Sequence, residues 1–303
     1  MAGATDAARA AADIILTQEG LGTIIHGIIY AREIFQRINN FITYRIAATL
    51  QLLFFFFIAT FAFHPSDFTQ PENATNPWPE FFHMPVLMLM VITVLNDGTL
   101  ITIAYDYAKA NSTPDRWNLP ALYMTSSVLG AVSCVSSLLL LWMLLDSWNP
   151  NGFFHRIGMK GIDYGQVISS IYLKVSVSDF LTLFSARTGS RFFWEVKPGP
   201  LLAAGGIFAL TASSLISIFW PYSEPDDIEV EGLRSDMALF GFVWLFCIIF
   251  WFIQDLAKVL AYKWMYAVNF NHISSSGVVV LPDSAKELIA KLDNSIGDEI
   301  VHK

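Results

Sequence analysis

Six long apolar stretches constrain this chain more than any other feature of its sequence. A helix needs about 20 mostly apolar residues to cross the hydrocarbon core of a bilayer. Six segments of this kind occur, approximately at 46–63, 86–105, 121–145, 166–186, 199–220 and 237–253. Charged residues make up 15% of the 303 residues, whereas an ordinary soluble domain carries about 25%. The sequence therefore predicts an all-α integral membrane protein, built as a six-helix transmembrane bundle.

The segments that flank this bundle are predicted to be cytoplasmic. Residues 1–25 read as a short helix, a buried strand at 13–16 and a turn, which is typical of the end of an α/β domain. No partner strands precede this strand, so we expect a chain truncated upstream. Residues 26–266 form the predicted transmembrane domain. Residues 267–303 form a short tail with helical spacing of apolar residues near 283–292.

The distribution of Lys and Arg between the connections predicts the orientation of the bundle. Four arginines precede the first span, whereas the connection 64–85 contains neither Lys nor Arg. Positive residues return in every second connection, which places them in the cytoplasm. We therefore expect both termini inside and the loop 64–85 outside, with a glycosylation sequon at Asn73. The net charge of -8 argues against a nucleic-acid partner and leaves the lipid bilayer as the predicted surroundings.

An aspartate stands in the middle of the second apolar stretch, within "VLNDGTLITI". Asp97 lies eleven residues after Val86, about 16 Å along a helix and near the centre of a core about 30 Å thick. A carboxylate there costs at least a few kcal/mol, and burial favours its proton-bound form, which suits a proton carrier. Asn96 is expected to hydrogen-bond this carboxyl group, and Gly98 to permit a break in the helix. The alternative is a structural aspartate at a helix kink.

Polar residues of the first span are candidate partners of Asp97, and two charged residues of the fourth span form a separate group. Arg45 is either its counter-charge or an arginine that extends to the headgroups. Gln51 lies six residues further along, about 9 Å deeper, and better matches the depth of Asp97. Lys174 and Asp179 make the fourth span the weakest of the six. They form either a second polar site on an ion pathway or a structural network between helices.

The sequence contains no motif for nucleotide, zinc or nucleophilic chemistry. Walker, nucleophile-elbow, zinc-ligand and dinucleotide-binding patterns are all absent. Cys134 and Cys247 lie in apolar runs and are predicted to be small core side chains. Asp255 and Lys258 are predicted to be an interfacial pair without a chemical role. One midplane carboxylate suits a proton, because sodium and calcium sites gather several oxygen ligands.

Five stretches occur in a specific order and spacing over about residues 3–266. They are "GATDAARAAADIILTQEGLGTIIHGI", "REIFQRINNFITYRIA", "LNDGTLITIAYD", "TPDRWNLP" and "YLKVSVSDFLTLFSART". Together they resemble the plasma-membrane proton pumps of the P-type ATPase family. The resemblance implies the tail of a cytoplasmic α/β phosphorylation domain, followed by the last six membrane helices of a pump in the plasma membrane.

The resemblance also implies a mechanism and residue roles. In the family, ATP phosphorylates an aspartate in a DKTGT motif, and a membrane carboxylate then carries one proton outward. That carboxylate matches Asp97, an arginine of the fungal pumps in "YRIA" matches Arg45, and a membrane glutamate of the fungal pumps matches Asp179. Plant pumps carry an arginine at the position of Gln51, where this sequence departs from them.

The family's nucleotide-binding and phosphorylated segments, and its first four membrane helices, have no counterpart in this sequence. ATP and Mg are therefore expected for the parent pump, no cofactor is expected in this chain, and the missing N-terminal portion is its expected partner. Two other functions remain open. One is a six-span scaffold or regulatory protein, and the other is a passive proton or cation leak. A chain that starts within a domain leaves strand edges uncovered, which favours the pump.

Overall fold

The computed structural model describes residues 22–69, 78–108, 117–159, 161–224 and 228–270, with isolated positions before residue 22. The sequon at Asn73 and the predicted tail helix lie outside the described residues. Of the predicted buried strand at 13–16, only Ile15 is described, and it is exposed and in no strand. The chain divides into two units. One comprises residues 1–36, 108–117 and 272–303, and contains a ring contact between Phe35 and Trp117. The other comprises residues 37–107 and 118–271 and contains the predicted transport residues.

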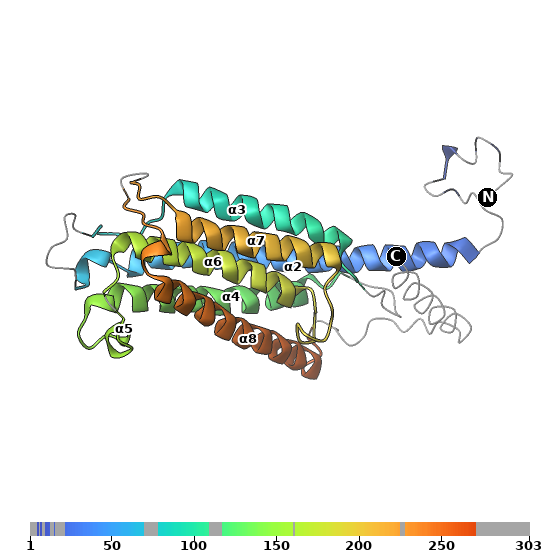
Figure 1. Cartoon of the computed structure of the whole chain (residues 1–303). Helices are drawn as coiled ribbons and strands as arrows, with labels where there is room; N and C mark the ends of the chain where they lie inside the picture. Colours follow the sequence, from blue (N-terminus) through green and yellow to red (C-terminus); the bar gives the residue numbers. More distant parts are fainter. Residues whose placement is uncertain are drawn as a thin grey trace. The chain divides into compact units, whose positions relative to one another are not determined.

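Six helices in the described residues are long and apolar enough to cross a membrane, as predicted. They are α2 (Gly22–Ala62), α3 (Val86–Ile101), α4 (Leu119–Leu145), α6 (Tyr164–Ala186), α7 (Pro200–Phe219) and α8 (Met237–Ala267). Within the second unit they run side by side (Figure 1). The described residues contain no named strand, and one isolated antiparallel bridge joins Ser223 to Val230. The prediction of an all-α membrane bundle is confirmed.

Short helices complete the connections between these long helices. They are the 3₁₀-helices η1 (Pro65–Asp67), η2 (Thr102–Tyr105), η3 (Asp146–Trp148) and η5 (Leu233–Ser235), and the single α-turn α5 (Phe153–Arg156). Local sequence explains two helix starts. The side chain of Asn118 accepts a hydrogen bond from the backbone N–H of Ala121, and that of Asp236 accepts one from Leu239. Both are N-caps, which satisfy amides that have no partner in the first turn.

The last helix continues well beyond its predicted end. The sequence predicted an end near residue 253, but α8 runs to Ala267. Gln254, Asp255 and Lys258 follow the predicted end, and all three are buried. Because neighbouring helices supply hydrogen-bond partners for these side chains, their polarity does not terminate the helix.

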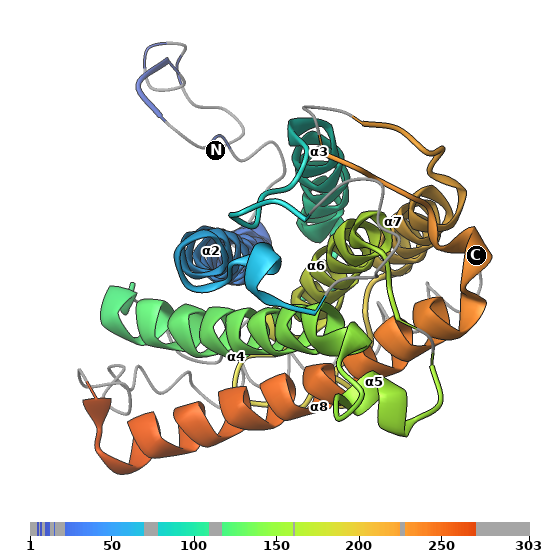
Figure 2. The same ribbon diagram turned by 90° about the vertical axis from the view of Figure 1, so that its left-hand side faces the viewer.

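Helix α6 lies at the centre of the bundle. It packs against α3 and α7 on one side and against α4 and α8 on the other (Figure 2). Of its most apolar window, 94% is buried, compared with 28% for α7 and for α8. Lys174 and Asp179 weaken its hydropathy, yet they lie on the helix that faces protein on all sides. Charged residues in membrane helices point into the bundle interior, so the least apolar span is also the central one.

Backbone contact joins α2 to α4. A Cβ atom added to Gly130 of α4 would lie 2.9 Å from the carbonyl oxygen of Ala47 in α2. The hydroxyl group of Ser126 donates to the carbonyl oxygen of Thr43 at 3.0 Å. Small residues allow this close approach between membrane helices. The contact fixes the side of α2 that faces the bundle, and thereby the side on which Arg45 projects.

Candidate functional site

Helix α3 sends two neighbouring polar side chains in different directions. Successive residues of an α-helix are separated by about 100° around its axis. Asn96 is buried, whereas 51% of the Asp97 side chain is exposed. The chain therefore presents one polar group to the interior of the bundle and the next to its surface.

Asp97 forms an ion pair with Arg45 of α2. The Arg45 Nη1 atom lies 2.5 Å from Asp97 Oδ1, and 46% of the arginine side chain is exposed. Of the two readings left open for Arg45, this geometry matches the counter-charge. A charged pair at membrane depth requires protein or enclosed water around it. About half of each side chain in this pair is exposed.

The expected hydrogen bond between Asn96 and Asp97 is wrong. Asn96 instead donates through Nδ2 to Asp179 Oδ2 of α6, at 2.8 Å. The helical direction of Asn96 explains the difference, because its side chain points towards α6 and away from its neighbour. Asp179 is fully buried, so the contact lies inside the bundle.

The expected helix break at Gly98 is also wrong. α3 remains an α-helix to Ile101 and then tightens into η2. No heavy atom lies within 4 Å of a Cβ added to Gly98, so no close contact requires glycine there. Asp97 is thus carried by regular helix.

Gln51 faces the bundle interior. It is buried, and its Nε2 atom has no hydrogen-bond partner. Its backbone nitrogen lies 3.5 Å from a Cβ added to Gly130, so Gln51 sits where α2 approaches α4. The structure brings Arg45, and not Gln51, to the carboxyl group of Asp97.

Lys174 belongs to a network separate from Asp179. Its Nζ atom donates to the carbonyl oxygen of Ser133 at 2.9 Å and to the hydroxyl group of Ser137 at 2.5 Å, both in α4. Residues five apart in a helix are separated by about 140° around its axis. Lys174 and Asp179 therefore contact opposite neighbours, α4 and α3, from one central helix.

Helix α8 supplies two buried polar groups that the sequence analysis gave no role. Gln254 donates through Nε2 to Ser133 Oγ at 2.8 Å. Lys258 donates to Asp255 at 2.7 Å, to the carbonyl oxygens of Ser185 and Arg191, and to the hydroxyl group of Thr188. Asp255 and Lys258 form the predicted pair, and both side chains are buried within the protein. Their spacing of three residues indicated a pair but not the loop that covers it.

A second buried ion pair joins the ends of α3 and α6. Arg187 Nε donates to Asp106 Oδ2 at 2.6 Å, and Arg187 Nη2 donates to Asp106 Oδ1 at 3.1 Å. The backbone N–H of Gly199 also donates to this carboxylate, at 2.8 Å. Both side chains are almost fully buried. Sequence reasoning missed this pair because 81 residues separate its members.

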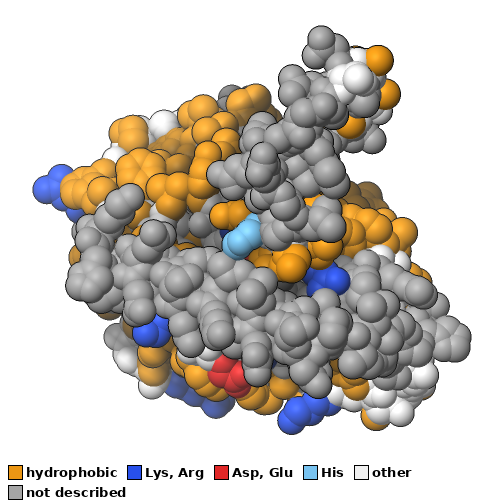
Figure 3. Space-filling model, turned by 90° about the vertical axis from the view of Figure 1, so that its right-hand side faces the viewer, with side chains coloured by type: hydrophobic (Ala, Val, Ile, Leu, Met, Phe, Trp, Pro, Cys, Tyr) orange, Lys and Arg blue, Asp and Glu red, His pale blue; other side chains and the backbone are white. Residues whose placement is uncertain are grey.

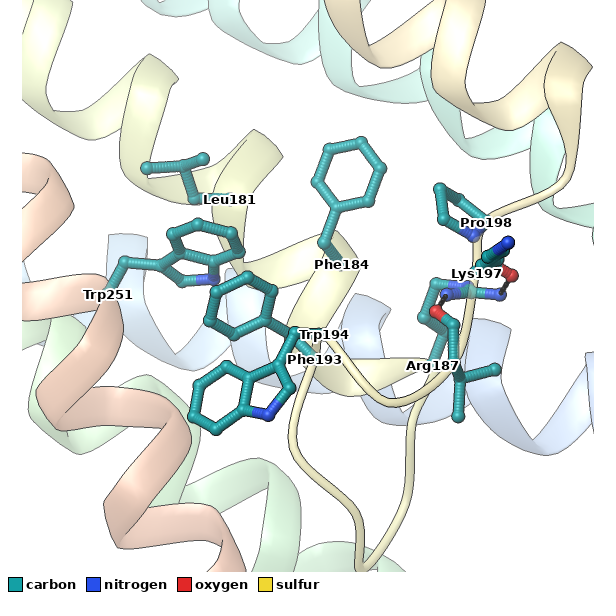
Figure 4. A pocket seen from close by; sticks show the side chains of 9 residues that line it. Leu181, Phe184, Arg187, Phe193, Trp194, Lys197, Pro198 and Trp251 are labelled. Atoms are coloured by element: carbon teal, nitrogen blue, oxygen red, sulfur yellow. Dashed lines mark hydrogen bonds between the residues drawn. The ribbon is translucent and has the colours of Figure 1, made fainter.

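A pocket of about 330 Å³ lies beside this pair, between the end of α6, the following loop and α8. Figure 4 shows its aromatic walls, with Phe193, Trp194 and Trp251 on one side and Phe184 above them. Arg187 lies at the other side, where it donates to the carbonyl oxygens of Val196 and Lys197. Because this guanidinium group is already paired, it is not available to a ligand.

Asp163 lies just before α6, outside the membrane spans, and its proton affinity is raised. Partial burial, and secondarily the charge of Glu229, raise the pKa of Asp163 above its ordinary value of 3.8. The folded state therefore holds this proton more tightly than the unfolded state does. Its ionisation destabilises the fold at neutral pH, and this cost disappears below the unfolded-state pKa.

We therefore expect Asp163→Asn to raise the unfolding temperature at neutral pH. The gain should shrink as the pH falls towards the ordinary pKa of an aspartate. Thermal unfolding of the purified protein in detergent over that pH range measures both effects. Asp67→Asn, an exposed aspartate in the loop after α2, is the control. A gain that is constant over the whole pH range would contradict the assignment.

The comparison with known proteins identifies relatives of this bundle. No model of a protein family matches the chain. The probable proton ATPases 1B and 1A of Leishmania donovani are 47% and 46% identical to it in alignments 276 residues long that cover 88% of this chain. The probable plasma membrane ATPase of Dictyostelium discoideum is 30% identical over 274 residues, or 86% of the chain. Over this segment, the chain belongs to the plasma-membrane P-type proton ATPase family.

The chain spans 28% of the length of the two Leishmania relatives and 23% of the Dictyostelium relative. Together with its six helices long and apolar enough to cross a membrane, these relatives identify the chain as an integral plasma-membrane protein.

Proposed function

We propose that this chain is the C-terminal transport portion of a pump that exports protons at the expense of ATP. Asp97 is the proton carrier and Arg45 its counter-charge. The observation that carries this proposal is the ion pair between them at 2.5 Å, at mid-span and about half exposed. In this proposal, the positive charge of Arg45 balances the carboxylate that remains after Asp97 has released its proton.

The remaining predicted residues have supporting roles in this proposal. Asn96, which precedes the carrier in α3, forms a buried hydrogen bond with Asp179 of α6. Gln51 lies where α2 approaches α4. ATP hydrolysis and Mg binding belong to the part of the pump outside this chain. Among the described residues, no group of three His, Cys, Asp or Glu side chains lies close enough to hold a metal ion.

About half of the Arg45 side chain and half of the Asp97 side chain are exposed. This exposure supports a protein partner at this face. In the pump, membrane helices of the N-terminal portion would cover it, because lipid cannot solvate a charged pair. An antibody raised to this chain would then detect a native protein far larger than 33.9 kDa. A native band near 33.9 kDa would contradict this and would favour a separate six-span protein.

The orientation proposed for the pump places both termini in the cytoplasm. Arg187, Arg191 and Lys197 lie in the loop after α6, and Figure 3 shows several separate Lys and Arg side chains on the face that it draws. By contrast, the connection 64–85 at the other ends of α2 and α3 has neither Lys nor Arg. The rule that positive loops remain inside supports this orientation.

The experiment that tests the proposal is ATP-dependent acidification by the intact pump in sealed vesicles free of sodium and potassium. We expect acidification by the wild type, most of it retained in Arg45→Lys, and a strong loss in Arg45→Gln, because only the amide removes the positive charge. Wild-type activity in Arg45→Gln would exclude the counter-charge role. A requirement for sodium or potassium would exclude the proton as the transported ion.

A further inference from the structure

The pocket between the end of α6, the following loop and α8 has apolar walls and takes no part in the proposed transport. Leu181 and Phe184 of α6 line it, and its volume is about 330 Å³. Figure 4 shows Trp194 and Trp251 on one side of it and Lys197 on the other. Ligand pockets combine a mostly apolar lining with a few polar groups that fix the orientation of the ligand. The lining therefore fits a mainly apolar molecule with an anionic end.

The loop that forms one wall of the pocket is held in place by buried charged residues. Lys258 donates to the carbonyl oxygen of Arg191 at 2.8 Å, and Asp255 accepts from the backbone N–H of Phe193 at 3.1 Å. Arg187 donates to two carbonyl oxygens further along the same loop. Because these contacts belong to the fold itself, the pocket exists before a ligand arrives. A preformed site lowers the entropic cost of binding.

The pocket adjoins apolar surface on both sides. Phe252 of α8 packs against Phe193, with ring centroids 5.4 Å apart, and 48% of Phe252 is exposed. Leu201, at the start of α7, is also 48% exposed. Leu181 lies five residues before the end of α6 at Ala186, about 7.5 Å along the helix. The pocket thus extends from a polar connection into a membrane span, which is the depth at which a lipid passes from headgroup to acyl chain.

Two positively charged side chains of the loop 187–199 are free. Arg191 and Lys197 are exposed, and neither side chain forms a hydrogen bond or an ion pair within the described part of the chain. Glu195 is the one acidic residue in this stretch of sequence, so the loop keeps a net positive charge. Lys197 also lines the pocket, which places an ammonium group beside the apolar walls.

We propose that this pocket binds one anionic phospholipid, with an acyl chain between Phe184 and Trp251 and its phosphate group at Lys197. A free phosphate ion would leave the aromatic walls unused, whereas a lipid uses both parts of the site. The orientation proposed above places Lys197 at the cytoplasmic leaflet, where anionic lipids are concentrated. Only this choice of leaflet rests on the proposed function.

Native mass spectrometry of the intact protein tests the site, after purification in detergent with equal amounts of phosphatidylserine and phosphatidylcholine. We expect wild type to retain one tightly bound phosphatidylserine. Leu181→Trp fills the pocket and should lose this lipid, and its unfolding temperature shows whether the fold is intact. Retention of the lipid by folded Leu181→Trp would overturn the proposal. Displacement of the lipid by inorganic phosphate would also overturn it, because the site would then recognise the anion alone.

A charge variant tests the headgroup contact separately. Lys197→Gln should lower the preference for phosphatidylserine over phosphatidylcholine by about fivefold, the effect of one lysine at a membrane surface. Lys263→Gln removes an exposed lysine further along α8 and should leave the preference unchanged. Equal preferences in these two variants would overturn the contact. Lys197 is exposed, so this test holds even if Leu181→Trp does not fold. Lipid retention requires neither ATP nor pumping, so its failure is distinguishable from failure of the proposed function.

Discussion

Asp97→Asn in the intact pump is expected to reduce ATP-dependent acidification to the level of protein-free vesicles. Asparagine has nearly the same shape as aspartate and can still accept a hydrogen bond from Arg45, but its amide does not take up and release a proton. The loss should therefore come from chemistry rather than from misfolding. Acidification and ATP hydrolysis measured on the same preparation would show whether transport is lost while the protein remains folded.

Thr93→Val is the matched control for this prediction. Thr93 lies one helical turn before Asp97, and its hydroxyl group bonds to the carbonyl oxygen of Leu89 in the same helix. Its loss removes a polar group from the same region of α3 without touching the ion pair, so acidification should be retained. Normal pumping by Asp97→Asn would rule out the carrier role.

Among the substitutions considered, removal of the Asp106 carboxylate should produce the largest loss of stability. Asp106→Leu would leave Arg187 buried without its carboxylate, and the backbone N–H of Gly199 without its acceptor. Breaking a buried ion pair by removing one partner costs about 3–5 kcal/mol. We expect a loss of this size in the free energy of unfolding, measured by denaturant titration in mixed micelles.

A double-mutant cycle with Arg187→Met separates the ion pair from general damage. If the pair is the cause, the double variant should lose much less stability than the sum of the two single losses, because no charge remains unpaired. Asp67→Asn provides the exposed control. A loss below about 0.5 kcal/mol for Asp106→Leu, the range of ordinary surface substitutions, would contradict this prediction.

Helix placement was predictable because it depends on local composition. The apolar stretches stand out from the polar connections, and the six spans follow from their lengths. The end of α8 was not predictable in this way. The buried Lys258 is accommodated in the helix because Ser185, Thr188 and Arg191, from another part of the chain, accept hydrogen bonds from its ammonium group.

The candidate site was predictable in part. Asp97 stands out from the sequence because a carboxyl group is costly in an apolar run, and Arg45 was one of two candidate partners. The sequence could not choose between Arg45 and Gln51, because the choice depends on which face of α2 packs against α4. Gly130 and Ala47 set that face by backbone contact, and this contact leaves Arg45 on the side of Asp97.

The sequence by itself determined that this protein is a six-span membrane bundle with one carboxylate near the middle of its second span. The six spans and the position of this carboxylate follow from hydropathy, which depends only on the residues within each segment. Only the tertiary structure decided that Asn96 pairs with Asp179, that Asp106 pairs with Arg187 and that α6 lies at the centre. These pairings join residues 81 to 83 positions apart, and their partners are set by helix rotation and packing, which no local segment encodes.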